Sequence, residues 1–240
     1  MESKNENSVN VKRLLFGLGL SLMLAGRTLH AQQSDADHTR LAELRAKAET
    51  GDAQAQNELG VCYAKGQGVA KDAVEAAKWY RKAAEQNLAE AQLNLGVCYD
   101  NAQGVTRDPV EAVKWYRKAA EQNLARAQFN LAFCYDKGQG VVKDQAETAK
   151  WYRKAAEQNL PAAQYFIGIC YLRGRGVEKD EVEGVKWVTL AAAQGDGHAK
   201  VSIRDIKEDV EDEQFAAGEK RAKEWLAQRK KASPVTQPHP

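Results

Sequence analysis

The chain has 240 residues, with 35 Lys and Arg against 33 Asp and Glu, and charged residues make up 28%. This composition is typical of a soluble, folded protein rather than a disordered one. Residues 1–31 hold four of the basic and two of the acidic side chains, so the remainder carries 31 of each. That balance excludes nucleic acid as an expected partner, because nucleic-acid binding normally needs a basic stripe.

The N-terminal segment has the pattern of an export signal. Two basic residues precede an apolar run from Leu14 to Ala25, and the small residue Ala31 follows. Twelve residues are too few for a membrane span of ~20 residues, but they fit the apolar part of a signal peptide. We therefore predict a signal at 1–31, cleaved after Ala31, and export to the bacterial periplasm or the cell exterior without a membrane span. The alternative is a buried N-terminal helix.

A repeat of 36 residues occupies most of the remaining chain. The segment WYRKAAEQNL begins at Trp79, Trp115 and Trp151, and a weaker copy begins at Trp187. A fixed period of this length predicts a stack of similar supersecondary units. The predicted segments are a flexible lead-in at 32–40, a solenoid over 41–231 with repeats at 53–88, 89–124, 125–160 and 161–196, a C-terminal cap at 197–231 and a disordered tail at 232–240.

Each repeat is predicted to start with a helix that has one apolar face. In the first repeat Ala55, Leu59 and Cys62 follow the helical spacing i, i+4, i+7. A small residue then follows the leucine or isoleucine, and we expect it to allow two helices to approach closely. The small residues are Gly60, Gly96, Ala132 and Gly168.

Glycines end this first helix and turn the chain. The second repeat has Ala102 where the others have the first loop glycine, so we expect Asn101 to adopt the left-handed conformation there.

The second helix of each repeat begins with an aspartate followed three residues later by a glutamate, as in Asp72 and Glu75. This spacing predicts a capping box, and capping explains the paired carboxylates without acid–base catalysis. The Trp, Tyr and Ala residues of this helix are expected to pack in the core, and its Lys and Arg residues to face water. In the C-terminal cap we expect the last helix to span Gly218–Lys231.

One cysteine occupies the same position in each repeat: Cys62, Cys98, Cys134 and Cys170. Equivalent positions of stacked helices lie ~8–10 Å apart, whereas the Cα atoms of a disulfide lie within ~7 Å. The cysteines are therefore expected to be small buried hydrophobic residues. All four histidines lie outside the repeats, and we predict no catalytic residues, no metal site and no cofactor.

The consensus A-x-A-Q-x-x-L-G-x-x-Y-x-x-G-x-G-V-x-x-D-x-x-E-A-x-x-W-Y-x-K-A-A-x-Q resembles the Sel-one-like repeat family, relatives of the tetratricopeptide repeats, over residues 41–206. The resemblance implies an all-α fold, a right-handed α/α superhelical solenoid of about four helix-turn-helix repeats with N- and C-terminal capping helices. It also implies a non-enzymatic adaptor. Some cysteine-rich secreted relatives are described as penicillin-binding with weak β-lactamase activity, but they carry two cysteines per repeat and this chain carries one.

By analogy with tetratricopeptide repeats, the first helix of each repeat lines the concave surface. The positions that vary between repeats become more aromatic toward the third and fourth units, which favours a surface for a peptide or partner helix. The alternative is that these side chains pack against the neighbouring first helix. The predicted partner-binding residues are Leu93, Val97, Asp100, Phe129, Phe133, Asp136, Tyr165, Ile169 and Arg173.

The leading hypothesis is an exported, non-enzymatic and monomeric scaffold that binds a protein or peptide through this surface. One alternative is a hydrolase of β-lactam or cell-wall peptide, although no set of nucleophile, base and orienting residue stands out. The other alternative is a structural module that self-associates through an end of the stack.

Overall fold

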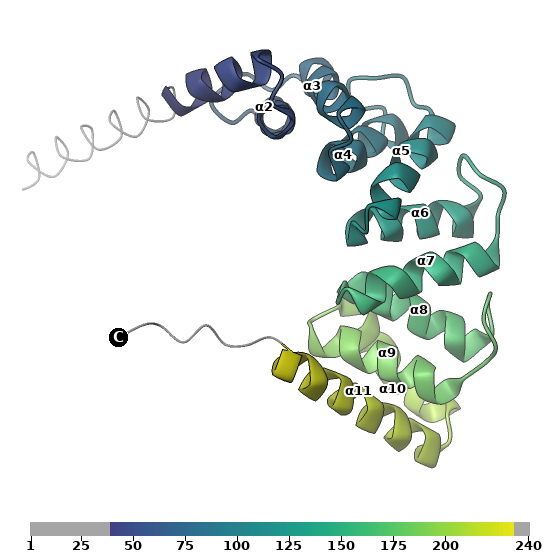
Figure 1. Ribbon diagram of the computed structural model, residues 1–240. Coiled ribbons are helices and arrows are strands. Elements are labelled where there is room, and N and C mark those ends of the chain that lie inside the picture. Colours follow the sequence, from purple (N-terminus) through teal and green to yellow (C-terminus); the bar gives the residue numbers. More distant parts are fainter. Residues whose placement is uncertain (1–38, 233–240) are drawn as a thin grey trace, which may run out of the picture.

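The computed structural model describes residues 39–232 (Figure 1). The predicted signal at 1–31, most of the lead-in and the tail from residue 233 lie outside these residues. Within them every regular element is a helix. After a helical segment at 39–49, the helices are α2 (Ala53–Lys65), α3 (Ala73–Glu85), α4 (Ala89–Asp100), α5 (Pro109–Glu121), α6 (Ala125–Lys137), α7 (Gln145–Glu157), α8 (Pro161–Arg173), α9 (Glu181–Ala193), α10 (Gly197–Asp209) and α11 (Asp212–Ala232).

The helices form an α/α solenoid, as predicted. The first helix of each repeat (helix A: α2, α4, α6, α8) packs against the second helix of the same repeat (helix B: α3, α5, α7, α9), and each helix B packs against the next helix A. Figure 1 shows the resulting arc, which runs from purple α2 to yellow α11.

Both ends of the solenoid differ from the prediction. Residues 39 and 40, assigned to the lead-in, are already helical, and α11 begins six residues before Gly218 and includes residue 232. Helix α11 lies against α9 (Figure 1). A Cβ atom on Gly218 would lie 2.6 Å from side-chain atoms of Val185, so glycine allows this close approach. The rings of Trp187 and Trp225 meet at 6.0 Å.

The prediction that an aspartate caps helix B is confirmed. The prediction of a full capping box is wrong, because the glutamate side chain does not return to the backbone N–H of the aspartate. Asp72 accepts hydrogen bonds from the backbone N–H groups of Val74 and Glu75 at 2.9 and 3.0 Å. The Glu75 carboxylate forms an ion pair with Lys78 at 2.6 Å instead of returning to the cap. The N–H of Asp72 donates to the carbonyl of Tyr63, 2.9 Å away, and thereby ties the loop to helix A.

The left-handed residue of the second repeat is Ala102, with φ of 55°, and not Asn101, with φ of −103°. Asn101 still donates its N–H to the carbonyl of Val97 as the cap of α4. Ala102 occupies the repeat position of Gly66, whose φ is 72°. The loop geometry of the repeat therefore overrides the preference of alanine for negative φ.

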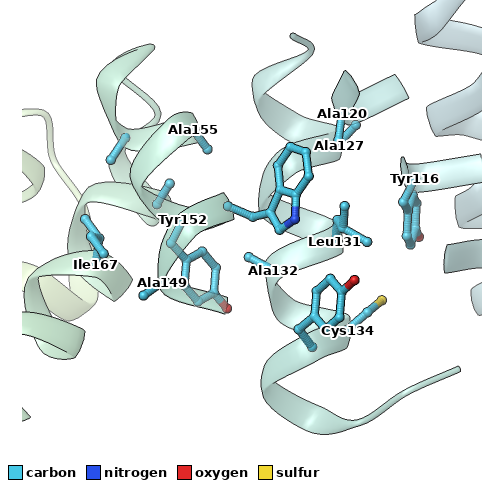
Figure 2. Close-up of a cluster of buried hydrophobic side chains, with 14 of the residues drawn as sticks. Tyr116, Ala120, Ala127, Leu131, Ala132, Cys134, Ala149, Tyr152, Ala155 and Ile167 are labelled. Carbon is cyan, nitrogen blue, oxygen red and sulfur yellow. The ribbon is translucent and has the colours of Figure 1, made fainter. Parts of the chain in front are cut away.

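The small residue on helix A allows close packing against helix B, as expected. A Cβ atom on Gly96 would lie 2.6 Å from the ring of Tyr116. In the third repeat, which has Ala132 at this position, Figure 2 shows Ala132 on α6 facing the side where Tyr152 of α7 lies.

Buried glutamines join each repeat to the one before it. Gln128 Nε2 donates to the carbonyl of Ala120 at 3.2 Å and to Asn123 Oδ1 at 3.1 Å, and Gln158 Nε2 donates to Gln128 Oε1 at 2.8 Å. Asn123 has a φ of 67°, which turns the chain from α5 into α6. Gln92 and Gln164 make the same contacts one repeat earlier and later.

Alanine substitutions at two loop glycines distinguish the free-energy cost of a positive φ from the free-energy cost of a steric overlap. Gly140 has a φ of 68°, and a Cβ atom there would overlap the backbone carbonyl of Pro109; Gly68 has a φ of 71° and only the side chain of Leu41 nearby. We expect Gly68→Ala to lower the free energy of unfolding by about 1–2 kcal/mol. Gly140→Ala should cost about 1–3 kcal/mol more, because the backbone must shift. Urea unfolding followed by circular dichroism measures both, and equal losses would contradict the prediction.

The glutamine network yields a second prediction. Gln128→Leu removes one donor to the carbonyl of Ala120, one donor to Asn123 Oδ1 and one acceptor for Gln158, at a position where Gln128 itself is 1% exposed. We expect a loss of about 1–3 kcal/mol in unfolding free energy, because three buried hydrogen bonds are lost while Ala120, Asn123 and Gln158 each keep another partner. Gln103→Leu, on an exposed loop, serves as the control and should change stability by less than about 0.5 kcal/mol. A stable Gln128→Leu variant would show that the network is dispensable.

Candidate functional site

One cavity, of about 290 Å³, lies between consecutive repeats where α4, α5, α6 and α8 meet. Four of the predicted partner-binding residues line it, and they come from two successive A helices. The cavity is lined by the predicted residues Val97, Asp100, Phe129 and Phe133, together with Asn101, Tyr116, Asn130 and Phe166. We call it the aromatic pocket.

A cluster of rings forms one side of the aromatic pocket. Phe129 lies 5.8 Å from Phe166 on the next helix A and 5.5 Å from Tyr152 of α7, measured between ring centroids. Tyr152 and Phe166 stack at 5.2 Å. Phe129 and Phe166 therefore pack against each other across neighbouring A helices, as the alternative interpretation expects of Phe129, and both also line the cavity.

The cavity has a polar floor around Tyr116. Burial, followed by the negative charge of Asp100, raises the pKa of the Tyr116 hydroxyl far above its usual value, while a hydrogen bond with Asn130 acts in the opposite direction. Tyr116 is therefore a neutral hydroxyl at every physiological pH. One repeat later, Phe166 takes the repeat position of Asn130, and the buried hydroxyl of Tyr152, the counterpart of Tyr116, has no hydrogen-bond partner among the described residues.

The other predicted residues do not line the aromatic pocket. Leu93 is only 4% exposed. The hydroxyl of Tyr165 lies 3.2 Å from the Ser202 hydroxyl of α10 and its ring stacks on His198, so the half-buried Tyr165 contacts the C-terminal cap. The remaining predicted residues are Ile169, which packs in the C-terminal core cluster, Asp136, which pairs with Lys137, and Arg173, which is exposed at the end of α8.

Sequence reasoning missed Phe166 and Asn130, which share one repeat position. That position is Glu58 and Asn94 in the first two repeats, and its polar character there concealed its role. The change from asparagine to phenylalanine in the fourth repeat was the available signal. Tyr116 was missed because it belongs to the constant WY pair, which the pattern assigns to the core.

The four cysteines are free thiols, and three of them are buried. Burial raises the pKa of Cys98 and Cys170 to about 11, and burial together with the charge of Asp100 raises that of Cys134 to about 12. Cys62 is half-buried. Their role as small hydrophobic residues is as predicted. Within residues 39–232 no group of three or more His, Cys, Asp and Glu residues could hold a metal ion.

Four consecutive Sel1 repeats match the sequence, at residues 53–88, 89–124, 125–160 and 161–196. The chain belongs to the Sel1 repeat family. Proteins of this family generally mediate protein–protein interaction and are typically non-enzymatic scaffolds. In the part of the chain that the structure describes, no helix is both long and apolar enough to cross a membrane.

Solved structures that are similar to this Sel1 repeat protein include the following two. A Sel1 repeat protein from Oxalobacter formigenes is 37% identical, and its TM-score is 0.68. The match covers 85% of this chain and 83% of the Oxalobacter protein. A protective antigen present in uropathogenic Escherichia coli strains, which displays an SLR fold, is 44% identical, with a TM-score of 0.65. That match covers 66% of this chain and 34% of the antigen, so this chain spans about a third of its length. No curated protein matches the chain in sequence.

The thiols give a prediction about reactivity. We expect iodoacetamide at pH 8 to modify Cys62 well before the other three cysteines. Those three thiols are buried, and their raised pKa values leave almost no thiolate at this pH. Since a raised pKa shifts thiolate formation to higher pH, labelling of Cys98 should accelerate up to about pH 11 in protein that stays folded. Peptide mapping by mass spectrometry, with urea-unfolded protein as control, measures each site. Equal labelling of Cys62 and Cys134 in the folded protein would contradict this.

Proposed function

We propose that this Sel1 repeat protein is an exported, non-enzymatic scaffold that binds a protein or peptide partner, with the aromatic pocket as its anchor site. The observation that carries the proposal is the meeting of variable helix-A residues in one cavity. Val97, Phe129, Phe133 and Phe166 come from three successive repeats and supply its apolar wall. A cavity lined by aromatic rings is the kind of site in which a partner buries an anchor side chain.

The size of the pocket favours a side chain over a larger ligand. Its volume of about 290 Å³ is at the lower end of cavities that hold small molecules, which range from roughly 300 to 1,000 Å³. A peptide or partner helix that inserts one large side chain would fill it, with the rest of the segment lying along the neighbouring A helices.

Phe133 is the pocket residue best suited to a test. Phe129 and Phe166 also pack with Tyr152 in the core, so their replacement would disturb the stack. Phe133 is half-buried, and its ring has a charged neighbour in Lys137, whose Nζ atom lies 5.6 Å from the ring centroid.

Export is the second part of the proposal and rests on the signal pattern before Ala31. Mass spectrometry of the protein recovered from the periplasm or medium of the producing cells tests it. We expect a mature chain beginning at Gln32. Full-length protein confined to the cytoplasm would contradict export without affecting the binding part of the proposal.

We expect Phe133→Ser to abolish capture of the partner, because it removes the exposed aromatic part of the anchor site. Crosslinking and affinity capture from an envelope extract, with quantitative mass spectrometry, would compare it with the unchanged protein. Val110→Ser is the matched control, since Val110 is 51% exposed and lies on a helix B. Both variants should retain their helical circular dichroism. Equal partner recovery by folded Phe133→Ser and Val110→Ser would contradict the pocket as the binding site.

A further inference from the structure

The aromatic pocket contains a carboxylate without a counter-ion. Asp100 lies at the C-terminal end of α4 and lines the cavity beside Val97 and Phe133. Among the described residues no Lys, Arg or His forms an ion pair with it. The guanidinium of Arg107 donates through Nε to the backbone carbonyl of Asp100 at 2.9 Å and not to the carboxylate.

The next repeat shows why Asp100 differs from its counterpart. Asp136 occupies the same repeat position, and the Nζ atom of the following residue, Lys137, lies 2.8 Å from its carboxylate. Asn101 stands where the third repeat has Lys137, and Asn101 itself lines the pocket. A single change from lysine to asparagine therefore leaves the carboxylate of the second repeat uncompensated.

The polar neighbours of Asp100 do not neutralise it. The Tyr116 hydroxyl and the Asn130 amide are uncharged groups, so they can hydrogen-bond a carboxylate without cancelling its charge. The effect of that charge extends into the core, where it raises the pKa values of Tyr116 and Cys134 in addition to burial.

We infer that the aromatic pocket takes a Lys or Arg side chain of the bound segment, with apolar residues beside it in that segment. This inference rests on the proposed function, because it specifies the partner of the same site. The cation would pair with the Asp100 carboxylate, and its aliphatic stem would lie against Phe129 and Phe133. Aromatic faces also attract cations directly. Lys137 shows this within the chain, with its Nζ atom 5.6 Å from the Phe133 ring centroid.

Other occupants fit the pocket less well. A carboxylate or phosphate would be repelled by Asp100 inside a partly desolvated cavity. A purely apolar side chain would fill the space beside the rings but would bury Asp100 without a charged partner, which costs free energy. A cation with an apolar stem satisfies both the charge and the rings.

The test uses two matched peptides, acetyl-Ala-Leu-Arg-Leu-Ala-amide and the same peptide with citrulline, the neutral isostere of arginine. Nuclear magnetic resonance titration of the purified, nitrogen-15-labelled protein follows the backbone amide of Asn101 and yields both dissociation constants. We expect the arginine peptide to bind roughly fivefold to tenfold more tightly at low salt, and the preference to shrink as salt is added.

Three variants locate the effect. Asp100→Asn should abolish the preference for arginine, and Asn101→Lys should do the same by supplying the internal cation that Asp136 already has. Asp136→Asn should retain the preference. All three should keep the circular dichroism of the unchanged protein, because Asp100 and Asp136 are only half-buried and Asn101 is exposed.

The outcomes separate this inference from the proposed function. Equal binding of both peptides at the Asn101 site would overturn the cation and leave the pocket as a peptide site. A preference that survives Asp100→Asn would overturn the role assigned to Asp100. Failure of both peptides to bind up to their solubility limit would overturn the inference too, while the capture experiment with Phe133→Ser would still decide the proposed function.

Discussion

The stack depends on the buried glutamine at the start of each helix A. The last carbonyls of a helix have no partner within that helix, and burying them between repeats would cost free energy unless something else donates to them. Gln128 adds a side-chain donor to one such carbonyl, that of Ala120, which also accepts the backbone N–H of Asn123, and Gln128 donates to the side chain of Asn123 in the connecting turn. Its own oxygen accepts from Gln158 of the same repeat. One amide therefore fixes where each repeat lies on the one before it.

The pocket is a consequence of this fixed stacking. Because each helix A is held at a constant offset from the previous one, residues 36 positions apart form rows across the stack. The constant core sets the depth of these rows: Tyr116 lies so close to Gly96 that no side chain would fit between them. The variable positions then decide the chemistry. Phe129 and Phe166 make ring contact across the boundary between repeats, and Asp100 adds a charge at its edge.

The sequence predicts the features that recur in the repeats, and it misses the contacts that depend on residues that differ between repeats. The period, the aspartate caps, the small close-packing residues and the unpaired cysteines recur in every unit, and each follows from a rule about local geometry. The site depends on single changes between units. Tyr165 was predicted to bind a partner, but it contacts Ser202 and His198 of the degenerate C-terminal cap and does not line the aromatic pocket. Phe166 was overlooked because Glu58 and Asn94 make its position look solvent-facing. Contacts between units that differ are not encoded in the period.

Differences between repeats also change the charge at the C-terminal ends of the A helices along the stack. Two adjacent positions at the end of each helix A carry its terminal charges, and their sum changes from repeat to repeat. The pairs are Ala64 and Lys65, Asp100 and Asn101, Asp136 and Lys137, and Leu172 and Arg173. The second repeat is thus negative, the third is internally neutralised by a 2.8 Å ion pair, and the first and fourth are positive. An extended segment with a cation near Asp100 and an anion toward Arg173 would match these charges in one direction and oppose them in the other. Charge order of this kind selects the orientation of a partner more than it adds affinity.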